Sequence, residues 1–566
     1  MTATFFQFKI LSYASEGSHY IIGVILSLKI KVWINTLIII FSFIFAIKIF
    51  RKSNKNHFVF FIYFFIIFIF AQEYAKTLFG PIGKKSWDDF NNPVSLLNEF
   101  SNPNKCMKIV GFYKFIQIDF FKTYLTLNIF PRKEEKEELE YLKNIYKDIK
   151  MHSKNEYTGI FKDKNIIFVQ LESMDIFLLN EKNTPTLHSL KNNSFVFTEH
   201  YSYKSSAGPT FNSEFCVNTG FYTPLSINSN SYDLYKNTFN TLPKMFKKLG
   251  YELKAFHFNY PEFYSRDVNY LGWGYDKFLS LMKTTNDYKD IDSAGLDTEL
   301  LKNKIFYEEI FNIKGRFLYF FITYSVHFPY YNKYKTHSYY ILNKKFDNKI
   351  PENLQEDDVA KILAEETDEM VKLLMEGLKK HNLYNNTIIV FYTDHSVGFA
   401  NNKILSKYKI TYDQRINHTP FFIWSSNMKE KIINKVNSQL DILPTILNLF
   451  GIPFQEKSMI GRDIFDNNNL GIAFFDDYSW IDGKILVNNG NITKLQNISD
   501  NEIDKNYILK TTQEVRERFK QYDLTLKYNY LKNILNKKIL IIHFYIYYNK
   551  YCKYPIRKDH KKNYNL

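Results

Sequence analysis

The sequence predicts an α/β protein, with a mostly parallel sheet flanked by helices and preceded by N-terminal transmembrane helices. Two observations lead to this fold class. From residue 165 onward, short apolar runs alternate with helical patterns, and polar loops follow the runs. Such alternation is typical of parallel strands joined by helices that cover both faces of a sheet. Near the N-terminus, two longer apolar runs contain no charged residue.

The chain has 566 residues, of which 45% are hydrophobic and 23% charged, which indicates a globular protein with more than one structural unit. We expect five regions along it. They are an N-terminal membrane region at 1–75, a connector at 76–160, a catalytic domain at 161–470, a small β-rich appendage at 471–530 and a basic tail at 531–566.

The two N-terminal apolar runs, at 32–47 and 58–71, predict transmembrane helices at about 32–50 and 58–72. A bilayer core needs ~20 residues of helix, fewer at the lower limit. Lys48, Arg51 and Lys55 lie between the runs, and a positively charged loop stays in the cytoplasm. The catalytic domain then lies outside the cytoplasm, at a bacterial plasma membrane. The alternative is a pair of buried core helices.

The formal net charge of +16 indicates an anionic partner, or simply a bias toward lysine codons. Because the chain has neither zinc-finger spacing nor a basic-helix pattern, we expect a lipid surface as partner and no nucleic acid. The three cysteines are odd in number and widely spaced, so a disulfide framework is not expected.

Five short apolar runs are the clearest predicted strands, and one long amphipathic pattern at 359–378 predicts a helix. The strands are expected at 166–169, 253–258, 317–323, 387–392 and 420–424. Ligands of such sheets bind at the carboxyl ends of the strands, so the chemistry is expected there.

Metal-competent side chains follow three of these strands. Glu172 follows the first, His327 the third, and Asp394 with His395 the fourth. A single polar residue at such a place is usually only a satisfied hydrogen-bonding group, but three strand ends together favour a site. Thr210 lies in the small-residue segment SSAGPTFNSEF before a predicted helix. That segment is either a simple helix cap or a loop whose N–H groups bind an oxyanion beside a hydroxyl nucleophile.

An ordered set of segments resembles the lipoteichoic acid synthase-type enzymes of the alkaline phosphatase/sulfatase superfamily. The main ones are NIIFVQLESM at 165–174, GPTFNSEF at 208–215, YSVHFPY at 324–330 and FYTDHS at 391–396. Further matching segments lie at 184–190, 256–278, 438–452 and 461–465. The resemblance covers about residues 160–465 and implies the alkaline phosphatase/sulfatase-like version of the α/β fold.

The resemblance also implies roles for residues. Glu172, Thr210, Asp394 and His395 would bind one divalent cation, with manganese expected and zinc or magnesium possible. Thr210 would also be the catalytic nucleophile. A set of two carboxylates, an imidazole and a hydroxyl suits such an ion on chemical grounds as well.

On the substrate side, the resemblance implies that His257, Tyr264 and Arg266 line the headgroup pocket. His327 would be catalytic and would also contact the substrate, either at the phosphate or by assisting the leaving group. A guanidinium such as that of Arg266 matches the geometry of a phosphate.

The implied function is that of a membrane-bound phosphotransferase of the cell envelope. It would move phosphoglycerol or phosphoethanolamine from a phospholipid to an extracytoplasmic glycan or lipid acceptor through a covalent Thr210 intermediate. The alternatives are hydrolysis of a phosphodiester or sulfuric ester at the same site, and a membrane protein that only binds phosphorylated ligands.

Three departures from the family leave the substrate open. Asn212 stands where family members usually have Asp, Tyr264 where they commonly have Trp, and only two of five expected membrane helices are found. Sulfate esters are disfavoured, because the segment around Thr210 lacks the Cys or Ser pattern that is converted to formylglycine. Cys216 is expected to be a buried helix residue.

Overall fold

The structure is a computed structural model that describes residues 134–531, apart from 148, 204–209, 224–239, 262, 285–295, 329, 331–336, 400–401, 489 and 500–501. The predicted transmembrane helices at 32–50 and 58–72 lie outside the described residues. So do most of the predicted connector and all but the first residue of the predicted basic tail. Within the part described, no helix has the length and apolar character needed to cross a membrane.

An eight-stranded sheet forms the centre of the molecule, in the order β5-β4-β6-β1-β7-β8-β2-β9. Pairing is parallel except on both sides of β8, so the sheet is mixed but mostly parallel, as predicted. The five predicted strands are present to within a few residues. In sheet order the strands are Lys277–Ser280, Glu252–His257, Phe317–Ile322, Asn165–Leu171, Thr387–Thr393, Phe421–Ser425, Ser194–Phe197 and Lys431–Ile433.

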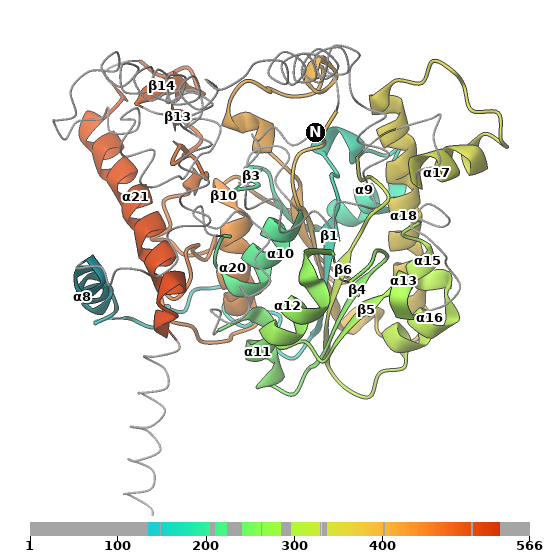
Figure 1. Ribbon diagram of the computed structural model, residues 1–566, viewed down its shortest axis with the longest axis horizontal. Coiled ribbons are helices and arrows are strands. Elements are labelled where there is room, and N and C mark those ends of the chain that lie inside the picture. The colour runs from blue at the N-terminus through green and yellow to red at the C-terminus, as the bar shows by residue number, and fades with distance from the viewer. Residues whose placement is uncertain are drawn as a thin grey trace, which may run out of the picture.

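Helices cover both faces of this sheet, as Figure 1 shows. On one face lie α10 (Thr210–Thr219), α11 (Leu242–Lys247), α12 (Arg266–Trp273) and α20 (Ile442–Leu449). On the other lie α9 (Pro185–Lys191), α15 (Glu299–Lys302), α16 (Lys304–Phe311) and α18 (Glu356–Lys380). The remaining helices near the sheet are α13 (Leu281–Thr284), α17 (His337–Lys345) and α19 (Asn402–Leu405).

Strand β1 explains why two cores form. All of its residues are buried, and their side chains alternate between the faces of the sheet. Ile166 and Phe168 pack into the core beneath α10 and α20, whereas Ile167, Val169 and Leu171 pack into the core beneath α18. A strand that is apolar throughout therefore belongs in the middle of a sheet covered on both sides.

Helix α18 shows the charge arrangement that stabilises a long helix. Its first turn carries Glu356, Asp357 and Asp358, and its last turn carries Lys379 and Lys380. These charges oppose the partial charges at the two helix ends. The helix is longer than the predicted 359–378 because its polar ends lie beyond the amphipathic pattern.

Two smaller sheets and two helices complete the described fold. A parallel pair joins β3 (His200–Tyr201) to β10 (Asn437–Ser438). An antiparallel sheet contains β11 (Ala473–Phe474), β12 (Trp480–Ile481), β13 (Ile485–Asn488) and β14 (Asn491–Lys494). Helix α21 (Lys505–Lys527) follows, and α8 (Glu134–Tyr146) packs beside its C-terminal end (Figure 1).

Candidate active site

Glu172, Asp394 and His395 meet at one edge of the large sheet. Strands β1 and β7 are parallel neighbours, and their last residues, Leu171 and Thr393, are paired. The residues that follow therefore leave the sheet side by side. Nε2 of His395 lies 3.6 Å from Oε1 of Glu172 and 3.3 Å from Oδ2 of Asp394. The three residues together form a group able to hold a metal ion.

Thr210 joins this group from the first position of α10. Its hydroxyl donates a hydrogen bond of 2.9 Å to Oε2 of Glu172. The helix is held to the same edge because the Ser213 hydroxyl donates to the carbonyl of Asp394 at 2.7 Å. All four residues with a predicted metal role are thus brought together.

The charges at this edge are suited to binding a cation. Both carboxylic residues are 3% exposed. Among the described residues, no hydrogen bond to Oδ2 of Asp394 is formed, although this oxygen is buried and lies 3.3 Å from Nε2 of His395. Burial and the neighbouring Glu172 carboxylate raise the pKa of Asp394 well above its usual value. Because two buried carboxylates repel each other unless a cation lies between them, the residues present suit a divalent ion.

Burial and neighbouring charges also shift the pKa values of Glu172 and His395. Burial raises the pKa of Glu172, but the imidazoles of His327 and His395 outweigh it, so this pKa is lowered overall. Burial lowers the pKa of His395, but the carboxylates of Asp394 and Glu172 outweigh it, so this pKa is raised. The negative charge therefore lies mainly on Glu172, whose Oε2 accepts the hydrogen bond from the Thr210 hydroxyl.

The predicted substrate-side residues gather at the next strands of the sheet. His257 ends β4 and donates from Nδ1 to the carbonyl of Ile322 at 2.9 Å. Burial and the charge of Arg266 lower its pKa well below the usual value, so the ring is neutral. His327 follows β6 and is half-buried; burial lowers its pKa, while the charge of Glu172 opposes this.

Tyr264 and Arg266 lie at the start of α12. The guanidinium of Arg266 lies 5.0 Å from the centre of the Tyr264 ring. Tyr264 and Ser265 both have positive φ, at 60° and 47°. Left-handed backbone at two successive non-glycine residues costs free energy and persists only where the surroundings hold it in place.

Glu214 is a residue of this region that the sequence analysis missed. It is fully buried and accepts hydrogen bonds from Arg266, at 3.1 Å from Nε and 2.7 Å from Nη2. The Tyr270 hydroxyl donates to it at 2.9 Å. Burial lowers the pKa of Arg266, but Glu214 raises it more, so the guanidinium stays charged. Because Glu214 follows Thr210 by one helical turn, it joins the nucleophile helix to α12.

Asp297 is a second buried acid that the sequence analysis missed. It accepts hydrogen bonds from the backbone N–H groups of Tyr324 and Ser325, at 2.7 and 3.1 Å, and from the Thr367 hydroxyl at 2.7 Å. These bonds hold the segment that leads to His327. No local pattern marks Asp297 in the sequence, because its partners come from distant segments.

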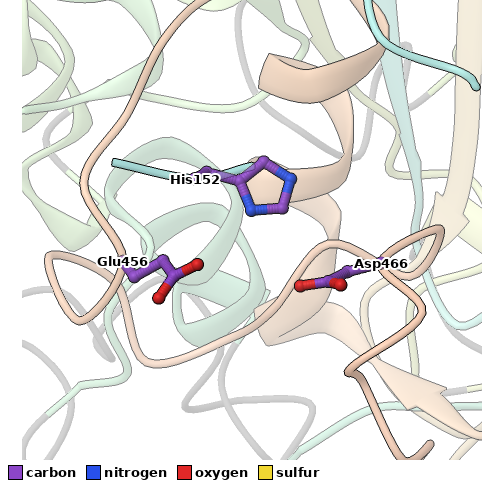
Figure 2. A group of neighbouring side chains, drawn as sticks. All are labelled: His152, Glu456 and Asp466. Atoms are coloured by element: carbon purple, nitrogen blue, oxygen red, sulfur yellow. The ribbon is translucent and has the colours of Figure 1, made fainter. Parts of the chain in front are cut away.

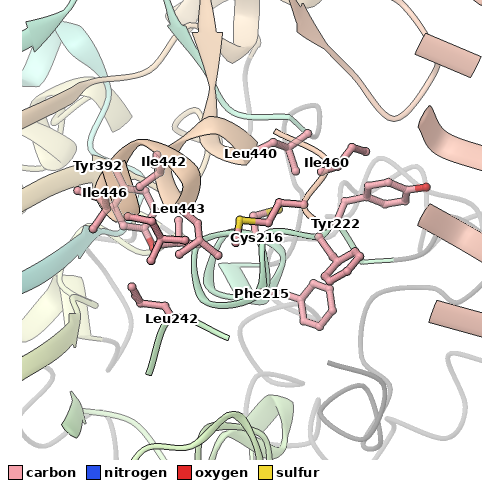
Figure 3. Packing of buried hydrophobic residues seen from close by; sticks show 14 of the residues in the cluster. Phe215, Cys216, Tyr222, Leu242, Tyr392, Leu440, Ile442, Leu443, Ile446 and Ile460 are labelled. Atoms are coloured by element: carbon pink, nitrogen blue, oxygen red, sulfur yellow. The ribbon is translucent and has the colours of Figure 1, made fainter. Parts of the chain in front are cut away.

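Cys216 is buried, as predicted. Figure 3 shows it in the apolar cluster between α10 and α20, to which Phe215, Leu440 and Leu443 also belong. Its thiol lies in this apolar cluster. The α10 side chain that contacts Glu172 is the hydroxyl of Thr210.

Comparisons with known proteins agree with this fold. The sulfatase family model matches residues 164–452. The lipoteichoic acid synthase of Staphylococcus aureus is 29% identical over 419 residues, which are 68% of this chain and 61% of that protein. The chain thus spans about three fifths of the length of this curated relative, and the predicted resemblance to the lipoteichoic acid synthase family is confirmed.

Two solved structures share the fold. The lipoteichoic acid synthase LtaP of Listeria monocytogenes superposes with a TM-score of 0.54 and 23% identity, over 69% of this chain and 97% of that one. A protein of the alkaline phosphatase superfamily from Vibrio parahaemolyticus superposes with a TM-score of 0.50 and 18% identity, over 71% of this chain and 97% of that one. The α/β fold is therefore alkaline phosphatase-like.

Proposed function

Since this chain belongs to the sulfatase family, whose enzymes typically depend on a metal, we propose that it is a membrane-bound phosphotransferase. It moves a phosphoglycerol or phosphoethanolamine group from a phospholipid to an extracytoplasmic glycan or lipid acceptor. The supporting observation is the contact of Thr210 with Glu172 beside Asp394 and His395. A threonine in this position suits phosphoryl transfer, whereas sulfate-ester hydrolysis in this family uses a formylglycine made from Cys or Ser.

The reaction has two steps. In the first, Oγ1 of Thr210 gives up its proton to Oε2 of Glu172 and attacks phosphorus; the bond from phosphorus to the diacylglycerol oxygen breaks, and diacylglycerol leaves as that oxygen takes up the proton from Glu172. In the second, an acceptor hydroxyl gives its proton to Glu172 and attacks the same phosphorus; the bond from phosphorus to Thr210 breaks, and Oγ1 of Thr210 takes up the proton. Glu172, Thr210, Asp394 and His395 would hold a divalent cation, which when bound would lower the pKa of the attacking hydroxyl and polarise the phosphoryl oxygen. Manganese is our first choice of ion, with zinc or magnesium as alternatives.

Substrate recognition falls to the residues around α12 and the ends of β4 and β6. We assign the headgroup pocket to His257, Tyr264 and Arg266, and contact with the phosphate or leaving group to His327. Arg266 keeps its charge because Glu214 compensates it, so it can offset negative charge that develops on phosphate. The proposed location is the bacterial plasma membrane with residues 161–470 outside the cytoplasm, which rests on the apolar runs at 32–50 and 58–72.

The intact mass of the protein tests the proposal directly. After incubation of the full chain with mixed phospholipids and manganese, we expect an added mass of one phosphoglycerol or phosphoethanolamine group, which identifies the donor. Thr210→Ala should carry no adduct, and Thr210→Ser should still carry one. Normal turnover by Thr210→Ala would rule out the nucleophile. Full-rate release of free headgroup without transfer to any acceptor would favour hydrolysis instead.

A further inference from the structure

A second group of metal-competent side chains lies in loops of the described region. His152 precedes β1, and Glu456 and Asp466 follow α20. Each offers one ligand atom, and these atoms lie within 4.8 Å of one another. Figure 2 shows the two carboxylates converging beneath the imidazole, on the side where its Nδ1 nitrogen faces them.

A buried acid fixes the orientation of His152. The His152 side chain is 8% exposed, and its Nε2 lies 3.2 Å from Oδ2 of Asp463, whose side chain is fully buried. The Asn155 amide donates to the same oxygen at 2.7 Å, and the backbone N–H of Phe465 donates to the other oxygen at 3.1 Å. Since a carboxylate oxygen accepts, Nε2 carries the ring proton. In the neutral ring Nδ1 then carries a lone pair, and among the described residues no hydrogen bond to it is formed. The hydrogen bond to Asp463 and the charges of the surrounding carboxylates raise the pKa of His152, so this nitrogen attracts a cation.

Among the described residues, the basic groups whose charge acts on these two carboxylates include His152 itself and Lys435, which acts on Asp466. Within the described part of the chain, no lysine or arginine nitrogen forms an ion pair with Glu456 or Asp466. The ammonium of Lys435, which lies nearby, donates to the backbone carbonyl of Asp466 at 2.9 Å instead. A nearly buried ring nitrogen that faces two carboxylates needs a cation between them, and this cation is either a proton on Nδ1 or a metal ion.

We propose that Nδ1 of His152 and the carboxylates of Glu456 and Asp466 bind a divalent cation of the zinc type, separate from the one at the sheet edge. One imidazole nitrogen and two carboxylate oxygens, with water in the open position, are a typical set for zinc. Asp463 is the outer carboxylate that orients the histidine ligand, as in many zinc sites. This inference does not depend on the proposed phosphotransferase activity.

The cation joins two segments that are far apart in the chain. The backbone N–H of His152 donates to the carbonyl of Phe454 at 2.9 Å, and Met151 forms an isolated bridge with Gln455. These contacts bring the segment before β1 against the loop after α20. A metal ion held by side chains from both segments closes a long loop and so stabilises this junction.

Zinc stoichiometry on the full chain in detergent tests the proposal. The protein is stripped with a chelator, and zinc is titrated against a chromophoric competitor. In a Glu172→Ala, Asp394→Ala background, which lacks the sheet-edge ligands, we expect one remaining equivalent of zinc. Adding His152→Ala should remove it. Glu456→Gln, a change at a surface side chain, should weaken zinc binding at least tenfold, whereas the exposed control Glu181→Gln should leave it unchanged.

Two results would overturn the proposal. One is a background variant that binds no zinc, which is the outcome if a protonated His152 simply pairs with Glu456 and Asp466. The other is an equivalent that survives both His152→Ala and Glu456→Gln. Because the active-site ligands are already removed in this background, neither result depends on whether Thr210 is the nucleophile.

Discussion

The described part of the molecule contains two groups in which a histidine lies near two carboxylates, and they differ in which elements supply the side chains. Glu172, Asp394 and His395 follow paired ends of the parallel strands β1 and β7. His152, Glu456 and Asp466 come from loops with no shared register. The sheet-edge group also contacts a hydroxyl at a helix start, which the loop group lacks among the described residues. Strand pairing thus places the side chains at the sheet edge next to a hydroxyl, whereas the loop contacts place only the histidine and the two carboxylates together.

The sharpest test of this difference is Asp394→Asn. The change removes a carboxylate from the proposed metal set, so we expect headgroup transfer to fall by ~10³-fold or more, about 4 kcal/mol in the barrier. In chelator-treated protein the raised pKa of Asp394 already relieves its repulsion from Glu172, so the melting temperature should change little. Transfer assays and thermal melts of the same preparation measure both effects. A variant that is active but less stable would assign Asp394 a structural role.

Glu214→Gln probes the link between the nucleophile helix and α12. It leaves the buried guanidinium of Arg266 without a compensating charge, which costs about 3–5 kcal/mol of folding stability. Tyr270→Phe removes only one hydrogen bond to a charged group, worth about 1.5–3 kcal/mol. We therefore expect chemical denaturation to rank Glu214→Gln well below Tyr270→Phe in stability, and transfer activity to fall with it. Equal losses would mean that the charge of Glu214 is not what holds Arg266.

Much of the fold and the centre of the site were predictable from sequence because both depend on local patterns. Runs such as Asn165–Leu171 are apolar throughout, and such runs belong in central strands. The rule that ligands bind at strand ends then placed Glu172 and Asp394. The direction of β8 was not predictable, because its antiparallel pairing depends on how the connecting segments run.

The missed residues share a different property. Glu214 binds Arg266 across 52 positions of sequence, and Asp463 binds His152 across 311. Neither acid follows a strand or stands at a recognisable spacing from its partner. Buried polar partners of this kind are set by tertiary packing, so a single sequence contains no pattern that reveals them.

Acidification tests a histidine that belongs to neither group. His200 in β3 is fully buried, and burial lowers its pKa to about 3. In the unfolded chain His200 binds a proton near the usual histidine pKa of about 6.5. The stability gained by burying the neutral ring is therefore fully present above that pH and is lost as the pH falls toward 3. Between pH 6.5 and 5 the loss should reach about 2 kcal/mol. Denaturation of His200→Gln across this range should show a flatter pH dependence; an unchanged slope would place the acid sensitivity elsewhere.

The smallest expected effect is that of Glu456→Gln on stability, and it tests whether the loop group binds a metal ion independently of the sheet-edge group. Glu456 lies at the surface, and among the residues that the structure describes its carboxylate makes no hydrogen bond or ion pair. In metal-free protein, Glu456→Gln should therefore change the unfolding free energy by no more than about 0.5 kcal/mol, as is usual for surface substitutions. Added zinc should raise the melting temperature of the parent more than that of the variant, because binding to the folded state alone stabilises it. If zinc raised the melting temperatures of both proteins equally, Glu456 would not bind zinc. The junction before β1 would then be stable without a metal ion, and only the carboxylates at the sheet edge would bind one.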